Sequence, residues 1–236
     1  MNSPEDKRKF DIRQWVLVTS WEPLDIYIFS GCYLKMCASD FSLTNLSDAM
    51  KHLSNYSVQK NSKANVEEFV LSNEQFTEYI RQTQPNFEWE RDLFSNIKDV
   101  VFRTLKGVQE TVEQKGNCFE VYGFDIIVDE QFAPWVIEVN LSPACAERTA
   151  FLTKFLDDMS IDLVGFMEQK VILSNDSWEF QFKERREALA RKNQSSGSYL
   201  NDESFYEKYD VKYRWVRMEE SILEGKAFGI ANNAYI

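Results

Sequence analysis

Residues 119–143, FEVYGFDIIVDEQFAPWVIEVNLSP, restrict the fold more than any other stretch of the chain. They hold two apolar runs, residues 121–128 and 135–139, joined by a short polar stretch that contains Pro134. This pattern predicts a β-hairpin whose loop is longer than a two-residue turn. Any sheet built on this hairpin must also accommodate the polar residues that lie within its strands.

Three oxygen-bearing side chains interrupt the apolar runs: Asp125 in the first strand, and Glu138 and Asn140 at the end of the second. Since side chains alternate along a strand, Glu138 and Asn140 share one face. A charge in a strand is costly unless it is paired or coordinated. Oxygen donors without Cys or His suit a hard cation such as Mg2+. Alone, Asp125 would more simply be a solvated edge residue, and the Glu138–Asn140 pair would be a weak signal; together they favour a metal site.

The hairpin sequence GFDIIVDEQFAPWVIEVNLSP resembles the metal-binding hairpin of the tubulin tyrosine ligase-like family, ATP-grasp enzymes that add amino acids to tubulin. Two upstream segments, KFDIRQWVLVTSWEPLDIYIF at residues 9–29 and HLSNYSVQK at residues 52–60, resemble further family segments in the same order. Within the family, residues 9–29 look closest to the glycine-adding branch. The resemblance implies the C-terminal half of an ATP-grasp catalytic unit.

The resemblance also implies roles for individual residues. The metal ligands for Mg2+ would be Asp125, Glu138 and Asn140, with Glu138 bridging two ions. Arg13 would contact the γ-phosphate of ATP or the incoming carboxylate, which makes Arg13 and Glu138 the expected catalytic residues.

Four further residues are expected near the nucleotide. The resemblance places Lys9 and Asp11 beside ATP, and Ser54 and Asn55 on phosphate or metal in a segment that usually reads Thr-Asn. Lys9, Asp11 and Arg13 alternate, so they share a strand face; a surface ion-pair ladder is the alternative reading.

Two other positions qualify the resemblance. Lys35 stands where the family usually has arginine, and lysine keeps the charge but loses the bidentate fork. His52 is expected to pack or hydrogen-bond rather than act as a base.

The predicted fold class is α+β, an antiparallel sheet flanked by helices. Strands are expected at residues 10–18, 24–29 and 33–38, with a turn at Gly31 between the last two. A capping box at Ser72 and Gln75 predicts a helix through Arg81. Helical spacing of apolar residues predicts two more helices, residues 87–113 and 147–171. Residues 41–63 are expected to form an irregular loop with one short helical turn.

The resemblance covers the chain unevenly. Residues 1–173 would be the C-terminal part of the ligase domain, and residues 174–236 a charged helical tail that includes KERREALARK at residues 183–192. Only eight residues precede Lys9, where the family has a whole N-terminal domain and the first half of the ATP-grasp. The chain is therefore expected to be a fragment that binds ATP weakly and turns over poorly by itself.

Composition excludes several classes of function. The net charge of −11 over 236 residues disfavours nucleic acid as a partner, and it opposes an acidic protein partner unless a local basic patch compensates. The chain has four Cys without CxxC spacing and one His, which makes zinc unlikely and reduced thiols the simpler interpretation. No apolar run is long enough to span a bilayer. The N-terminus is polar, so a cytoplasmic protein without a membrane partner is expected.

The resulting hypothesis is an ATP- and Mg2+-dependent ligase that adds glycine to glutamate side chains of tubulin through an acyl phosphate. Its partners would be the acidic C-terminal tails of tubulin or microtubules, with glycine as co-substrate. Its location would be the cytoskeleton, including a cilium or flagellum axoneme. Two alternatives stay open: a tubulin glutamate ligase, and a non-catalytic microtubule-binding module that uses Arg185 and Arg186 of the KERREALARK helix.

Overall fold

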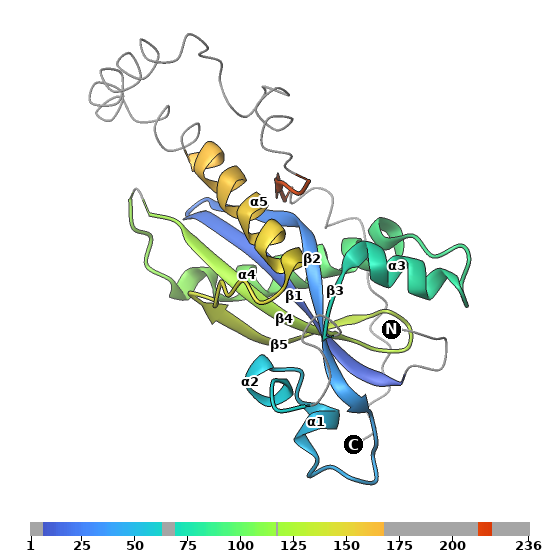
Figure 1. Ribbon diagram of the computed structural model, residues 1–236. Helices are drawn as coiled ribbons and strands as arrows, with labels where there is room; N and C mark the ends of the chain where they lie inside the picture. Colours follow the sequence, from blue (N-terminus) through green and yellow to red (C-terminus); the bar gives the residue numbers. More distant parts are fainter. Residues whose placement is uncertain (1–6, 63–68, 117, 168–211, 219–236) are drawn as a thin grey trace, which may run out of the picture.

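The centre of the molecule is an antiparallel sheet of six strands (Figure 1). The computed structural model describes residues 7–62, 69–116, 118–167 and 212–218. The strands follow one another along the sheet in the order β3-β2-β1-β4-β5, and β6 also pairs with β2. Their bounds are β1 Arg8–Trp21, β2 Leu24–Asp40, β3 Val70–Ser72, β4 Glu120–Val128, β5 Pro134–Leu141 and β6 Trp215–Arg217.

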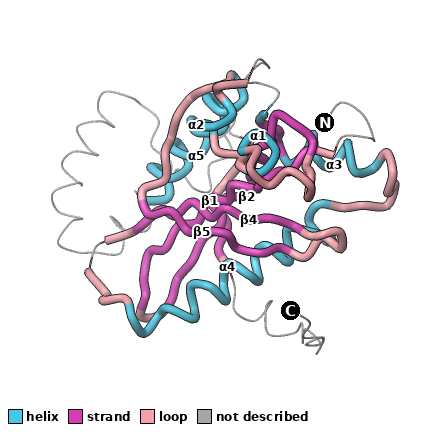
Figure 2. The backbone as a smooth tube through the Cα atoms, turned by 90° about the horizontal axis from the view of Figure 1, so that it is seen from below, coloured by secondary structure: helices cyan, strands magenta, loops and turns pink. Residues whose placement is uncertain are grey.

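Helices cover both faces of this sheet. Figure 2 shows α4 on one side of the strands, and α5 and α2 on the other. One core lies under α3 and α4 and includes Ile12, Phe76 and Ile97; the second lies under α5 and includes Trp15 and Phe155. The predicted α+β class is therefore confirmed. The helical segments are α1 Ala49–His52, α2 Tyr56–Gln59, α3 Asn73–Arg81, the π-helical turn η2 Glu90–Phe94, α4 Ser95–Val108, the 3-10 turn η3 Gln109–Thr111 and α5 Ala150–Met167.

The predicted hairpin is present as β4 and β5, and β5 forms the edge of the sheet. Its loop is organised by Asp129, whose Oδ1 accepts hydrogen bonds from the backbone N–H groups of Gln131 at 3.0 Å and Ala133 at 2.9 Å. Phe132, between them, has a φ of 59°. A bulge shifts the pairing between Asp125 and Ile126. This hairpin brings the polar residues of its two strands opposite each other.

The predicted turn at Gly31 is wrong, because β2 runs unbroken from Leu24 to Asp40. Gly31 instead lies where the pairing of β1 with β2 changes register, between the pairs Gln14–Cys32 and Val16–Ile28. A glycine inside a strand pattern can mark such an irregularity as well as a turn.

The helix predictions depend on local signals and are confirmed in the described residues. Ser72 and Gln75 form the reciprocal capping box at the start of α3. The long helical stretch begins at Glu90 and ends at Thr111 through η2, α4 and η3. The helix predicted over residues 147–171 is α5, and the part beyond residue 167 lies outside the described residues. The loop before β3 holds two short helices, α1 and α2, rather than one turn.

Residues 212–218 return to the sheet beside β2 and contribute two aromatic rings to the core under α5. Tyr213 and Trp215 are 6% and 8% exposed, so part of the segment assigned to the predicted tail completes the main body. The predicted boundary at residue 173 and the KERREALARK helix lie outside the described residues. Within the ranges that the structure describes, no helix is long and apolar enough to cross a bilayer.

Candidate active site

A row of charged side chains crosses three neighbouring strands on one face of the sheet. Arg13 of β1 is paired in register with Asp125 of β4, and Asp125 is paired with Glu138 of β5. Directly opposed residues on antiparallel strands project to the same face. Three of the residues singled out by the sequence thus occupy consecutive positions in this row.

Asp125 is the buried centre of the row, with a side chain only 4% exposed. Arg13 donates to both of its carboxylate oxygens, from Nε to Oδ1 at 2.7 Å and from Nη2 to Oδ2 at 3.1 Å. Lys35 of β2 adds a second cation, 2.9 Å from Oδ1. The charge of Asp125 is therefore compensated by two cations, which offsets the free energy cost of burying it.

The ionisation of Asp125 and Arg13 is set by burial and by neighbouring charge, which shift each pKa in opposite directions. Burial would raise the pKa of Asp125, but the hydrogen bond from Arg13 and the charge of Lys35 hold it below its ordinary value. Burial would likewise lower the pKa of Arg13, and the contact with Asp125 raises it instead. Both groups are charged at neutral pH.

Asn140 connects the two hairpin carboxylates. Its Nδ2 lies 3.2 Å from Oε1 of Glu138, 3.5 Å from Oδ2 of Asp125 and 3.3 Å from the carbonyl oxygen of Gly123. The structure thus brings together the three residues predicted as metal ligands. Gly123 lets Pro143, just after β5, and the Arg13 side chain lie close to β4, because a Cβ there would be 2.7 Å from Cβ of Pro143 and 3.2 Å from Cδ of Arg13.

Lys9, Asp11 and Ser54 form a second polar group, next to the row. Nζ of Lys9 lies 3.0 Å from Oδ1 of Asp11 and 3.0 Å from the carbonyl oxygen of His52, and the Ser54 hydroxyl donates to Oδ2 of Asp11. Arg13, two residues further along β1, is paired across the strands to Asp125 instead. The alternating residues therefore do not form a simple surface ladder. The His52 ring hydrogen-bonds the carbonyl oxygen of Asn45, as a packing role would require.

A cavity of about 280 Å3 lies against this part of the sheet. Five predicted site residues line it: Arg13, Ser54, Asn55, Glu138 and Asn140. Lys9, Asp11 and Asp125 do not line it.

Three lining residues were missed by sequence reasoning: Tyr33, Tyr56 and Arg148. The register of β2 places Tyr33 opposite Arg13, which the alternation of β1 and β2 could have shown. Burial raises the pKa of Tyr33, although the charge of Arg13 opposes this rise. Tyr56 and Arg148 lie outside the strands, and no local pattern marks either one.

The donors around Asn140 fit a hard cation. Asp125 and Glu138 supply carboxylates. Asn140 directs its Nδ2 at both of them, so its amide would have to turn for its oxygen to complete the all-oxygen set that Mg2+ prefers. In the described ranges no three His, Cys, Asp or Glu side chains form a cluster, so the amide is a necessary third donor. Because both oxygens of Asp125 already bind Arg13 or Lys35, Glu138 and Asn140 are the more available pair.

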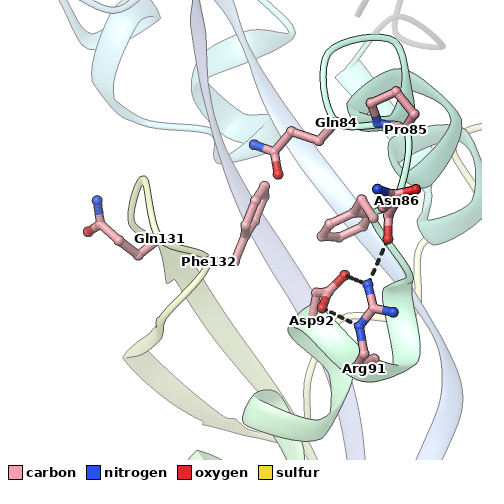
Figure 3. Close-up of a pocket in the computed structure, with 8 residues that line it drawn as sticks. Gln84, Pro85, Asn86, Arg91, Asp92, Gln131 and Phe132 are labelled. Carbon is pink, nitrogen blue, oxygen red and sulfur yellow. Dashed lines mark hydrogen bonds and ion pairs between the residues drawn. The ribbon is translucent and has the colours of Figure 1, made fainter.

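A second hollow, of about 440 Å3, lies between the loop after α3 and the tip of the hairpin (Figure 3). Its arginine is already engaged, since Arg91 binds the carboxylate of Asp92 and the carbonyl oxygen of Asn86. Phe132 packs on Phe87 with ring centroids 4.9 Å apart. None of the predicted site residues lines this hollow. The Phe132–Phe87 contact beside it holds the tip of the hairpin against the loop after α3.

Residues 5–177 match the model of the Tubulin-tyrosine ligase family. "Tubulin glycylase 3E" of Tetrahymena thermophila is 43% identical over 173 residues, which cover 72% of this chain and 12% of the relative. Human "Tubulin monoglycylase TTLL3" is 30% identical over 189 residues, covering 77% of this chain and 24% of that protein. Mouse "Protein monoglycylase TTLL8" is 32% identical over 189 residues, covering 77% and 23%. The chain thus spans less than a quarter of the length of these relatives.

Proposed function

Because the chain belongs to the tubulin-tyrosine ligase family, we propose that it carries part of the active site of an ATP-dependent ligase that joins glycine to glutamate side chains of tubulin. The sheet and its flanking helices are consistent with the C-terminal part of an ATP-grasp fold. The similar proteins named above are glycylases, which favours glycine over glutamate as the added amino acid.

The observation that carries the proposal is the convergence of Asp125, Glu138 and Asn140 beside Arg13. Amide formation from a carboxylate needs an activated acyl group, and an acyl phosphate formed from ATP supplies one. Phosphoryl transfer of this kind is accelerated by fixed positive charge near the transferring group. The row provides that charge next to oxygen donors for a cation.

Each residue of the row has a distinct task in this proposal. Arg13 presents a guanidinium to the cavity, and its bonds to Asp125 fix the orientation of that group. Glu138 and Asn140, with Asp125 behind them, would hold Mg2+, which neutralises phosphate charge when it is bound.

The second polar group would act on the nucleotide. Lys9 and Asp11 are proposed to lie beside ATP, and Ser54 and Asn55 to contact its phosphates. Ser54 is 4% exposed and its hydroxyl is bound to Asp11, so the position of Asp11 depends on the loop before α2.

Titration calorimetry with Mg-ATP tests the site directly. The unaltered chain is expected to bind weakly, and Glu138→Gln to remove the binding because it loses a carboxylate ligand. Glu130→Gln, an exposed change in the loop of the same hairpin, is the matched control and should bind as the unaltered chain does. Equal binding by the Glu138→Gln variant would contradict the assignment of the metal site.

Transfer is tested separately with labelled amino acids, Mg-ATP and tubulin. We expect slow incorporation of glycine and none of glutamate by the unaltered chain, and no incorporation by the Glu138→Gln variant. Glutamate incorporation would favour the alternative ligase. Co-sedimentation with microtubules without any incorporation would favour a non-catalytic binding module.

The expected location follows from the acceptor. A tubulin-modifying ligase acts in the cytoplasm on the cytoskeleton, and we propose the axoneme of a cilium or flagellum as its site. A tagged copy that stains axonemes in ciliated cells would support this, and exclusion from microtubule structures would oppose it.

A further inference from the structure

Arg148 is stacked on an aromatic ring at the rim of the cavity. It lies between β5 and α5, and its Cζ is 4.1 Å from the ring centroid of Tyr56, the first residue of α2. Both residues line the cavity. A guanidinium placed over a ring is held by cation–π attraction while its N–H groups stay available at the edge of the stack. The contact thus fixes an arginine that is otherwise exposed.

The charges around the cavity are unevenly distributed. Arg13, Lys35 and Arg148 line it, against the single carboxylate of Glu138. Arg13 and Lys35 are both bound to Asp125, which lies behind the lining. Among the residues that the structure describes, Arg148 forms no ion pair with a carboxylate. Arg148 is therefore the lining cation best able to accept an anion from outside.

We propose that Arg148, oriented by Tyr56, binds a carboxylate of an acidic acceptor peptide at the mouth of the cavity. This inference rests on the proposed function, since it assigns a residue to the acceptor of that reaction. A cavity of about 280 Å3 cannot enclose a peptide, so the peptide must be recognised where the lining meets solvent. Arg148 is at that position, whereas Arg13 is buried.

The overall charge of the chain explains why a local cation would help to bind an acidic peptide. A chain of net charge −11 repels an acidic peptide at long range. A local excess of positive charge at the cavity mouth offsets that repulsion where the acceptor has to lie.

Fluorescence anisotropy with a labelled, C-terminally amidated oligoglutamate peptide tests the inference on the full chain at low salt. Arg148→Ala should weaken peptide binding about tenfold, which corresponds to the loss of one charge-assisted contact. Arg148→Lys should restore it only in part, because lysine lacks the planar fork. Tyr56→Leu should weaken binding and Tyr56→Phe should retain it, since only the ring is required.

Arg103→Ala is the control, because this exposed arginine is paired with Asp99 on α4 and does not line the cavity. Its peptide affinity should equal that of the unaltered chain. The affinity of every variant for Mg-ATP should also stay unchanged. Thermal melting identifies any variant that has lost the fold. If Arg148→Ala or Tyr56→Leu is lost in this way, the peptide affinities of the Tyr56→Phe and Arg148→Lys variants test the inference instead.

Three results would overturn the inference: no peptide binding by the unaltered chain, equal binding by the Arg148→Ala variant, or loss of Mg-ATP affinity alone, which would assign Arg148 to nucleotide phosphate. These outcomes are separable from failure of the proposed function. If the chain binds oligoglutamate through Arg148 but incorporates no glycine, the inference holds and the proposed ligase function is contradicted. If the Arg148→Ala variant incorporates glycine as well as the unaltered chain does, the ligase function holds and the inference about Arg148 is contradicted.

Discussion

Arg13 and Asp125 form a two-pronged ion pair between β1 and β4, with Nε–Oδ1 and Nη2–Oδ2 distances of 2.7 and 3.1 Å. The two residues are 112 positions apart in the sequence, and their side chains are 11% and 4% exposed. The pair therefore links the first strand of the sheet to the hairpin that carries the other oxygen donors.

Removing the Arg13 guanidinium should destabilise the fold as well as the site. Arg13→Ala leaves Asp125 buried with Lys35 as its remaining partner, and we expect a loss of roughly 3 kcal/mol in the free energy of unfolding. Urea denaturation measures it. Arg103→Ala, which removes an arginine that is 58% exposed, should cost less. Equal losses in the two variants would show that the buried Arg13–Asp125 pair stabilises the fold no more than an exposed ion pair does.

The same pair predicts a dependence of stability on pH. Since the folded pKa of Asp125 is lowered, its contribution is fully present above the ordinary aspartate pKa of about 3.9, and it is lost as the pH falls through the lower folded value. The difference in free energy of unfolding between the unaltered chain and Asp125→Asn should therefore shrink as the pH falls from about 5 through the ordinary aspartate pKa and below it. A difference that stays constant over this range would contradict the lowered pKa.

The hairpin loop should depend on one carboxylate. Asp129 accepts hydrogen bonds from two backbone N–H groups and, at 3.2 Å, from Nε1 of Trp135. Asp129→Ala should lower the free energy of unfolding by about 1–2 kcal/mol, and Asp129→Asn by less because the amide oxygen still accepts. Thermal or urea melts give the values. Glu130→Ala, next to it in the same loop, should have little effect.

A pair of glycines offers a test of packing. At Gly31 a Cβ would lie 2.6 Å from Cδ1 of Tyr213 and 2.8 Å from Cε2 of Phe155, so Gly31→Ala should cost roughly 1–3 kcal/mol. At Gly107, inside α4, a Cβ meets no atom within 4 Å, and Gly107→Ala should stabilise by up to about 1 kcal/mol. Neither glycine has a positive φ, so backbone strain contributes to neither change. Differential scanning calorimetry of both variants should give shifts of opposite sign.

The sequence predicted best what depends on nearby residues. The capping box of α3 involves residues three apart, and the hairpin needs only two apolar runs and a loop. The grouping of Asp125, Glu138 and Asn140 followed from strand alternation across that hairpin. The roles given to these residues stay predictions until the calorimetry above is done.

What the sequence could not show depends on contacts between distant residues. Strands β3 and β6 have three residues each, too few for a periodic pattern, and they exist because β2 pairs with them. Gly31 gave a turn signal, but in the structure it lies within an unbroken strand, where a Cβ would clash with Tyr213 and Phe155. The pairing of Arg13 with Asp125 likewise joins residues 112 positions apart, which no local pattern indicates. Tyr56 and Arg148 meet only through the tertiary fold.

The return of residues 212–218 to β2 sets an order in which the polypeptide can be completed during its synthesis. Apart from Met218, the core under α3 and α4 is made once translation has passed Leu141 at the end of β5. The opposite side must wait for Tyr213 and Trp215, which pack on Phe29 with ring centroids 6.0 and 5.2 Å apart. A ribosome stalled before Tyr213 would therefore carry a nascent chain whose α4 side lacks only Met218, while its α5 side lacks both of these aromatic rings.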